Sequence, residues 1–225
     1  MKADVVVGAQ YGDEAKGKIA HHLCKTGGYT HVLRFNGGCN AGHTIYHNGT
    51  KFVTHHIPCG VFYGITSIIG PGCVVDPVQF FKEIEELEAA GIDAESLVLI
   101  AKNAHVITDT HREEDSKDSK IGTTKRGNGP AYRDKYGRTG VRAESMKCLD
   151  IDHGDYPYVT SSHCTSAAAL LAGIPPQAID KVWGVAKIYE TYVGAKKFEP
   201  DDETFKIIRN IGKEYGATTG RPRQC

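Results

Sequence analysis

Short apolar segments alternate with amphipathic ones along the chain. A strand–helix–strand succession of this kind places consecutive strands parallel to one another, with helices packed on the sheet. The pattern therefore predicts an α/β fold with a mostly parallel central sheet and flanking helices. Strands are predicted at residues 5–7, 30–35, 67–70, 97–100 and 182–189, a turn at Pro71-Gly72, helices at 19–25, 76–91 and 165–172, and an amphipathic segment at 201–211.

The clearest helix signal begins at Asp76 and Pro77. Aspartate is a favoured N-cap residue, and proline is favoured at the first helical position. Gly91 is predicted to end this helix. An apolar stripe follows the start of the helix at Phe80, Phe81, Ile84 and Leu87. The glutamates between these positions are predicted to face water, namely Glu83, Glu85, Glu86 and Glu88.

A hairpin is predicted around Asn48-Gly49. This dipeptide lies between two alternating segments, 45–47 and 51–54, and is the strongest short-range hairpin signal. His47, His55 and His56 lie on or beside the hairpin. They have no partner cysteine or aspartate at ligand spacing, so we interpret them as surface side chains of the strands and not as a metal cluster.

A glycine-punctuated polar loop follows the first predicted strand. Residues 12–18 have the spacing G-x-x-x-x-G-K of a Walker-type loop, in which backbone N–H groups at a helix N-terminus bind phosphate. The next residue is Ile19, so the hydroxyl that usually ligates magnesium is missing. Asp13 offers a hard oxygen ligand instead, or a base. The alternative interpretation is an ordinary strand–turn–helix.

A second polar loop, residues 36–44, follows the next strand, where open α/β sheets bind their ligands. Asn40 and Gly42 provide an amide group and close backbone approach beside His43. A lone histidine is usually structural, but an imidazole in this setting is suited to proton transfer near neutral pH. We therefore predict a chemical role for His43.

Two later loops contain residue types that bind phosphate. Residues 121–132 combine glycines with hydroxyl and basic side chains, although this composition also suits a surface loop. Residues 111–120 before them are densely charged and are predicted to form an exposed helix end or loop. Residues 150–162 are predicted to form a third polar loop.

Composition excludes several classes of protein. The chain of 225 residues is 40% hydrophobic, and its 27 basic residues balance 27 acidic ones, so no basic field favours nucleic acid or an anionic membrane. We find neither a long apolar run nor a signal peptide. Seven scattered cysteines without a C-x-x-C pair indicate reduced thiols in a cytoplasmic protein and argue against zinc.

Five segments together resemble the adenylosuccinate synthetase family: GAQYGDEAKGK, NGGCNAGHT, IGTTKRGNGPAYRDK, LDIDHGDYPYVTSS and GATTGRPRQC. They follow the family's order from Val5 to Cys225. Members of this carbon–nitrogen ligase family phosphorylate the 6-oxo group of IMP with GTP and magnesium. The amine of L-aspartate then displaces the phosphate, giving adenylosuccinate, GDP and phosphate. The resemblance implies this activity in AMP biosynthesis, a P-loop-NTPase-like fold and Mg2+ as cofactor.

The resemblance also implies roles for individual residues. Asp13 would remove the N1 proton of IMP and, with the carbonyl of Gly42, ligate magnesium. His43 would be the general acid or the electrostatic partner of the transferring phosphoryl group. GTP binding is implied for Gly12, Asp13, Glu14, Ala15, Lys16, Gly17, Lys18, Gly42, His43, Thr44 and Arg223.

Further implied roles concern the two other substrates. IMP binding is implied for Asp13, Lys16, Asn40, Ala41, Gly42, His43, Thr123, Thr124, Thr160 and Arg221. Arg138 would reach IMP from the neighbouring subunit, which implies a homodimer with shared sites. Aspartate binding is implied for Ala217, Thr218, Thr219, Gly220, Arg221, Pro222 and Arg223.

The chain departs from the family pattern in three places. Only residues 143–148 stand where the family has a long insertion that ends in an IMP-binding E-G-A-Q-G loop. The sequence stops at Cys225, before the K-x-D-type loop that reads guanine. We therefore expect residues 1–225 to be one incomplete domain, joined near 143–148 and truncated after 225. Ala15 replaces the family's glycine, a mild change if that position is helical.

Two other functions remain open on the sequence alone. A catalytically inactive nucleotide-binding fragment or degenerate homologue would bind GTP or IMP without turnover. A general P-loop NTPase or kinase would act without aspartate, and the missing hydroxyl after Lys18 argues against it.

Overall fold

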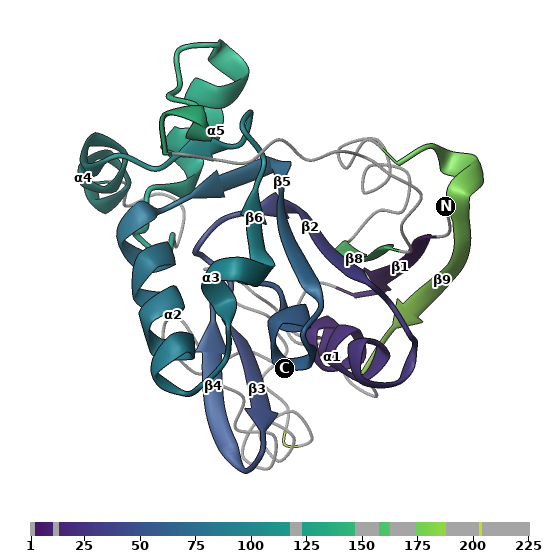
Figure 1. Cartoon of the computed structure of the whole chain (residues 1–225). Helices are drawn as coiled ribbons and strands as arrows, with labels where there is room; N and C mark the ends of the chain where they lie inside the picture. The colour runs from purple at the N-terminus through teal and green to yellow at the C-terminus, as the bar shows by residue number, and fades with distance from the viewer. Residues whose placement is uncertain are drawn as a thin grey trace.

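The computed structural model describes residues 3–10, 14–117, 123–146, 158–162, 174–187 and 203. Within these residues a seven-stranded sheet has the order β6-β5-β2-β8-β1-β9, with β7 paired to β5 (Figure 1). All of its pairings are parallel, which confirms the predicted fold class. The strands are β1 (Ala3–Gly8), β2 (His31–Gly37), β5 (Thr66–Val75), β6 (Val98–Ile100), β7 (His105–Val106), β8 (Tyr158–Ser162) and β9 (Ile179–Val185).

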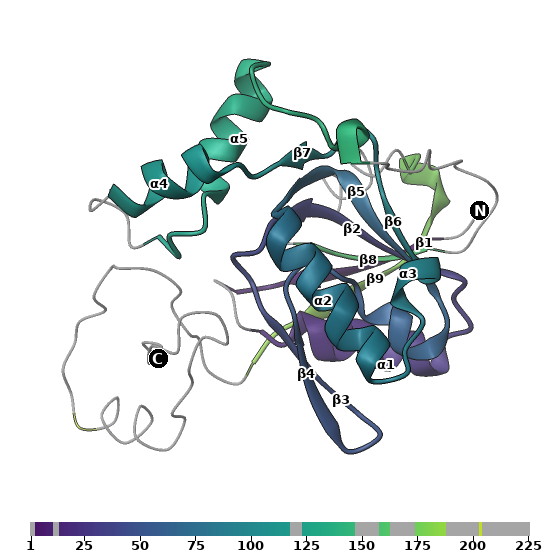
Figure 2. The same cartoon turned by 60° about the vertical axis from the view of Figure 1, so that its left-hand side comes forward.

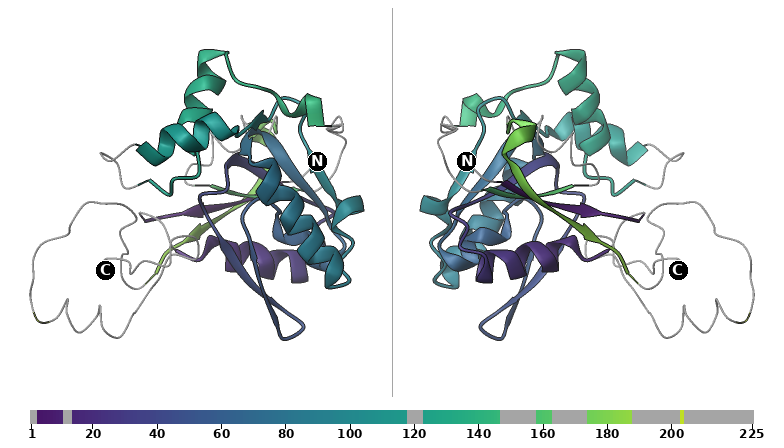
Figure 3. Two further views of the ribbon diagram at one scale, coloured as in Figure 1. Left: turned by 90° about the vertical axis from the view of Figure 1, so that its left-hand side faces the viewer. Right: turned by 90° about the vertical axis from the view of Figure 1, so that its right-hand side faces the viewer.

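Two groups of helices pack against this sheet: α1 and α2 contribute to the core on one face, and α5 packs at the carboxyl end of β5, around Val74. Figures 2 and 3 show α1 and α2 on one side and α4 and α5 towards the other. The helical segments are α1 (Lys16–Thr26), α2 (Pro77–Ala89), α3 (Ala94–Leu97), α4 (Asp109–Lys117) and α5 (Asn128–Gly137), with short 3-10 turns η1 (Cys59–Tyr63), η2 (Ala143–Met146) and η3 (Pro176–Ala178). None of these helices is long and apolar enough to cross a bilayer.

Alternation along each strand divides its side chains between two cores. Val6 and Ile69 face the core that includes Leu23 of α1 and Leu87 of α2. Their neighbours Val5 and Ile68 lie in the core on the other face, with Phe35. Successive side chains of a strand point to opposite faces of the sheet. Consecutive apolar residues are therefore expected in a parallel sheet that is covered on both faces.

The predicted turn at Pro71-Gly72 is wrong, because β5 continues through both residues. The pairing of β5 with β2 shifts register between Arg34 and Asn36. Proline is tolerated in a strand at such an irregularity, because no ladder hydrogen bond is needed there. A Cβ atom at Gly72 would collide with the carbonyl oxygen of Phe35, so glycine permits the close approach of the two strands.

The strand β8 corrects the predicted third polar loop at its end. Residues 158–162 pair with β1 on one side and β2 on the other, in the middle of the sheet. The tyrosine, valine and threonine of this segment favour strands, but its polar neighbours led to the prediction of a loop. The predicted helix at 165–172 and, apart from residue 203, the amphipathic segment at 201–211 lie outside the described residues.

The hairpin of β3 (His43–His47) and β4 (Thr50–Thr54) confirms the Asn-Gly signal. Asn48 has φ 48° and Gly49 has φ 79°, so both central residues are left-handed, as a type I′ turn requires. This hairpin extends away from the sheet beside α2 (Figure 1). It begins at His43, so its docking determines where that imidazole lies.

The signals at both ends of α2 are also confirmed. The carboxylate of Asp76 accepts hydrogen bonds from the backbone N–H groups of Val78 and Gln79, at 3.1 and 3.4 Å. Gly91 has φ 78° just beyond the last turn. Phe81 does not belong to the buried stripe, because it is 53% exposed. Consecutive helical positions lie about 100° apart, so only one of two adjacent phenylalanines faces the core.

Candidate functional site

The two polar loops predicted to act together meet at the carboxyl ends of β1 and β2. Gly17 lies in the first turn of α1, directly after the phosphate-type loop. A Cβ atom at Gly17 would lie 3.4 Å from Cγ of His43, so the imidazole packs against this turn. The structure thus places His43 beside the helix that follows the loop. Gly12 and Asp13 lie outside the described residues.

Glu14 has a different environment from that expected of a residue open to GTP. Its side chain is fully buried and pairs with the ammonium group of Lys16. The backbone N–H of Gln10 donates to the other carboxylate oxygen at 3.3 Å. The Gln10 amide in turn donates to the Lys187 carbonyl at 3.0 Å and accepts from the Lys187 N–H at 2.9 Å. Glu14 therefore braces the loop from within, whereas Lys18 is exposed.

Ala15 lies in a conformation that suits glycine. It is the N-cap of α1, with φ 69° and ψ 30° in the left-handed region, and not a helical residue. Alanine is expected to be a mild change only if this position is helical, and the structure does not meet that condition. A left-handed residue with a Cβ atom costs about 1–2 kcal/mol.

We predict that Ala15→Gly raises the free energy of unfolding by about 1 kcal/mol, because glycine adopts the left-handed region without strain. Urea unfolding measures the change. The matched variant Ala20→Gly, inside the same helix, should instead lower the free energy by about 1 kcal/mol. An unchanged or lowered stability for Ala15→Gly would contradict this assignment of strain.

The imidazole of His43 is neutral at physiological pH in this structure. Burial, followed by the positive charges of Arg34 and Lys16, lowers its pKa to about 4. A small cavity of about 30 Å³ lies against the ring, and Arg34, His56 and Cys59 also line it. His43 can therefore donate a hydrogen bond to an anion without carrying a charge beforehand.

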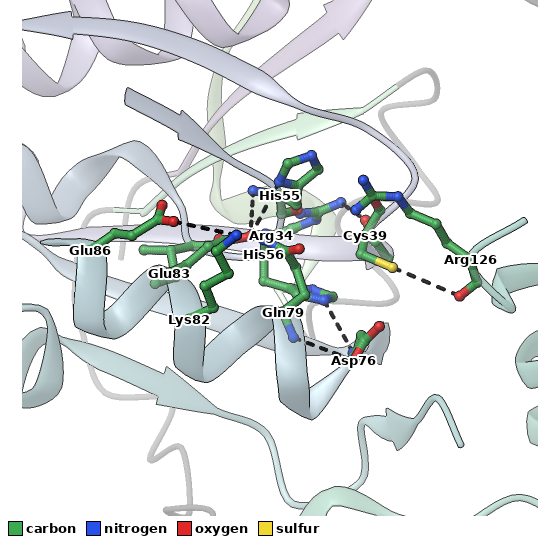
Figure 4. Close-up of polar contacts among 12 residues, drawn as sticks. Arg34, Cys39, His55, His56, Asp76, Gln79, Lys82, Glu83, Glu86 and Arg126 are labelled. Carbon is green, nitrogen blue, oxygen red and sulfur yellow. Dashed lines mark hydrogen bonds and ion pairs between the residues drawn. The ribbon is translucent and has the colours of Figure 1, made fainter. Parts of the chain in front are cut away.

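Glu83 is a site-forming residue that the sequence analysis placed in water. Only 1% of it is exposed, and its carboxylate accepts from the backbone N–H groups of His55, His56 and Ile57 at 2.9 to 3.3 Å (Figure 4). The Gln79 amide donates to it at 3.0 Å. Burial alone would raise the pKa of Glu83, but the hydrogen bonds from His55 and from the backbone lower it to about 2.

His56 is not a surface histidine either. It is 1% exposed, and its Nε2 atom accepts a hydrogen bond of 3.1 Å from the backbone N–H of Asp76. This acceptor role requires a neutral ring. Burial, followed by the charge of Arg34, lowers the pKa of His56 to about 3. The segment after the hairpin is thus fixed to α2 by both Glu83 and His56.

These buried groups predict a loss of stability in acid. Unfolded histidines bind protons below their ordinary pKa of 6.5, whereas folded His43 and His56 do so only near 4 and 3. The free energy of unfolding should therefore fall with pH below about 6.5, by about 1.4 kcal/mol per pH unit for each histidine. Below about 4.5, Glu83 adds to the slope in the same direction.

Urea unfolding at a series of pH values tests this prediction. In the His56→Gln variant, the free energy of unfolding should fall less steeply with pH between neutral pH and about pH 5, because one titrating group is removed. A free energy of unfolding that stays level over this range would contradict the neutral state of both histidines in the folded protein.

The glycine-rich segment before α5, together with α5 itself, contacts β2, β5 and the loop after β2. The Tyr132 hydroxyl accepts from the Gly37 N–H at 2.6 Å and donates to the Gly72 carbonyl at 2.9 Å. Arg126 donates to the Cys39 carbonyl at 3.4 Å. The predicted IMP residues Asn40 and Thr124, with Thr123, therefore lie on two loops that the structure joins.

The remaining predicted site residues are less directly placed. Thr160 lies in β8 with Val5 and Leu33 as strand partners, so the carboxyl end of β8 points to the same edge of the sheet. Arg138 lines a separate cavity of about 340 Å³ with His105 and other basic residues. Residues 217–223 lie outside the described residues. Within those described, no three His, Cys, Asp or Glu side chains gather as a metal site.

The fold and the two joined loops define a parallel α/β protein with a phosphate-type loop at the carboxyl end of its β1 strand. The family model described as adenylosuccinate synthetase matches residues 5–148 and 145–225 of this chain. The chain belongs to the adenylosuccinate synthetase family, a family of ligases of purine biosynthesis.

Individual relatives agree with the family match. The adenylosuccinate synthetase of Bordetella avium is 36% identical over 305 residues, covering 98% of this chain and 70% of its own length. That of Thermodesulfovibrio yellowstonii is 37% identical over 306 residues, covering 100% of this chain and 72% of its own length. Both alignments are longer than the chain of 225 residues, so part of the relatives' sequence has no counterpart here.

Solved structures give the same result. The fully ligated adenylosuccinate synthetase from Plasmodium falciparum is 28% identical, with a TM-score of 0.85 over 100% of this chain and 71% of that one. A succinoaminodeoxyadenylate synthetase from cyanophage S-2L has a TM-score of 0.78 at 20% identity, covering 99% of this chain and 77% of that one, and shares the fold.

Proposed function

We propose that this chain catalyses the GTP-dependent ligation of L-aspartate to IMP. The products are adenylosuccinate, GDP and phosphate, formed through 6-phosphoryl-IMP. The observation that carries this proposal is the packing of His43 against Gly17, in a chain of the adenylosuccinate synthetase family. This contact brings a proton-transfer group to the first turn of the helix after the Walker-type loop, where a nucleoside triphosphate would bind.

In this proposal, Asp13 and His43 act on one oxygen of the purine. Asp13 takes the N1 proton, so that the 6-oxygen can attack the γ-phosphate. The neutral imidazole of His43 donates a hydrogen bond to the phosphoryl group as charge develops on it. Bound phosphates would raise the pKa of His43 from about 4, because negative charge stabilises the imidazolium form.

Magnesium fits the donor atoms that the chain provides. The carboxylate of Asp13 and the carbonyl of Gly42 are hard oxygen ligands, and Gly42 immediately precedes the histidine that packs on the phosphate-loop helix. When bound, Mg2+ would neutralise negative charge on the GTP phosphates.

The other predicted residues complete the proposed site. Asn40, Thr124 and Thr160 would hold IMP, with Arg138 supplied by the second subunit of a cytoplasmic homodimer. Residues 217–223 would bind the carboxylates of aspartate. The cavity that contains Arg138 is separate from the cavity beside His43, in agreement with a role towards another subunit.

A single assay separates this function from the alternatives. The chain is incubated with IMP, GTP, aspartate and Mg2+, and adenylosuccinate and GDP are measured with and without aspartate. Ligation requires both products in equal amounts and an Asp13→Asn variant that forms neither. Binding of GTP or IMP without turnover would instead indicate an inactive nucleotide-binding protein, and GDP release without aspartate would indicate an NTPase.

A further inference from the structure

The guanidinium group of Arg34, on β2, donates three hydrogen bonds, all of them to backbone carbonyls. Its Nε atom donates to Asn36 at 3.3 Å, one Nη atom donates to Gly38 at 2.6 Å, and the other donates to His55. Two of these carbonyls belong to the loop that leads to His43, and the third belongs to the segment after β4. Arg34 therefore joins two segments that are far apart in the sequence.

The loop is shaped around this side chain. Gly37 has φ 91°, and a Cβ atom there would lie 3.1 Å from a terminal nitrogen of Arg34. The Gly38 N–H in turn donates to the Asn40 side chain at 3.3 Å. The contacts of Arg34 thus reach, through Gly38, a residue predicted to bind IMP.

Arg34 and Glu83 hold the backbone of the same residue, His55, from opposite sides. The N–H of His55 donates to Glu83 at 2.9 Å, and the carbonyl of His55 accepts from Arg34. Figure 4 shows these side chains converging on the segment between β4 and α2. An anion at the N–H end and a cation at the carbonyl end of one chain segment strengthen each other's hydrogen bonds.

Resting on the function proposed above, we propose that Arg34 is a positioning residue of the IMP site. It holds the loop of residues 36–43, with Asn40 and His43, on the segment that Glu83 fixes to α2. Loss of this clamp would leave the loop free to move and weaken IMP binding before it affected the chemical step.

Arg34 and His43 line the same small cavity, together with His56. The charge of Arg34 can be separated from its hydrogen-bond geometry by substitution, because lysine keeps the charge but cannot donate to three carbonyls from one planar fork.

The test compares Arg34→Lys with Arg34→Gln in the whole chain. Steady-state assays give kcat and the KM for IMP, and calorimetry gives the Kd for IMP. Arg133→Lys, at an arginine that pairs on the surface with Glu114 and Asp134, is the matched control.

We expect both Arg34 variants to raise the KM and the Kd for IMP about tenfold or more, because each loses at least one charge-assisted hydrogen bond. The kcat at saturating substrates should change less than the KM for IMP in both variants. Glu83→Gln should raise the KM in the same way, and Arg133→Lys should change none of these values.

Wild-type IMP affinity in Arg34→Lys would overturn the proposal. A purely structural role for Arg34 would lower kcat and the free energy of unfolding without raising the KM for IMP, and that result would overturn it too. If the wild-type chain forms no adenylosuccinate, the proposed function fails, but the Kd for IMP still decides the role of Arg34.

Discussion

Replacing His43 with asparagine should lower kcat about 10²–10⁴-fold, the range typical of a lost proton-transfer group. Asparagine keeps a hydrogen-bond donor of similar size but cannot exchange a proton at neutral pH. The ring of His43 packs on Gly17, so its loss acts where the phosphoryl group would lie. The measurement is kcat for adenylosuccinate formation with all substrates saturating.

The control for this variant is His22→Asn, at an exposed histidine on α1. It should retain wild-type kcat, and thermal unfolding should show that His43→Asn remains folded. A folded His43→Asn protein with kcat within about threefold of wild type would remove His43 from the chemical step, because such a change is below about 1 kcal/mol.

Replacing Glu83 with alanine should lower the free energy of unfolding by about 3 kcal/mol or more, because buried N–H groups would lose their acceptor. Three consecutive N–H groups, of residues 55–57, donate to this carboxylate. Alanine leaves all three without a partner and also removes the 3.4 Å contact between the carboxylate and Nδ1 of His55. Urea unfolding at neutral pH measures the loss.

Glu86 provides the matched comparison on the same helix. Its side chain is 57% exposed and pairs with Lys82 at 3.7 Å across one turn. Glu86→Ala should change the free energy of unfolding by less than about 0.5 kcal/mol. Similar values for the two alanine variants would show that the buried carboxylate contributes no more than a surface one.

The fold was predictable where a local signal decided the structure. Asp76 with Pro77 predicted the start of α2, and Asn48-Gly49 predicted the hairpin, because capping and left-handed turns depend on neighbouring residues alone. Glu83 was not predictable in this way. It lies among similar glutamates, and only the approach of the segment after β4 distinguishes it from exposed Glu86.

The candidate site follows the same division. The glycine and histidine motifs predicted which loops would contain the site, and the contact between Gly17 and His43 brings two of them together. Alanine itself gave no local signal of the left-handed conformation at position 15, because it is a normal helix residue, whereas the glycine that stands there in the family is consistent with it. The position of β8 depends on pairing with two distant strands, which no local pattern encodes.

The place of β8 also affects how the chain can fold. β1 and β2 follow one another in the sequence but never pair, because residues 158–162 lie between them in the sheet. During synthesis, most of the chain must leave the ribosome before β8 can take its position between β1 and β2. Such high contact order slows folding, so the nascent chain should depend on chaperones until β8 emerges.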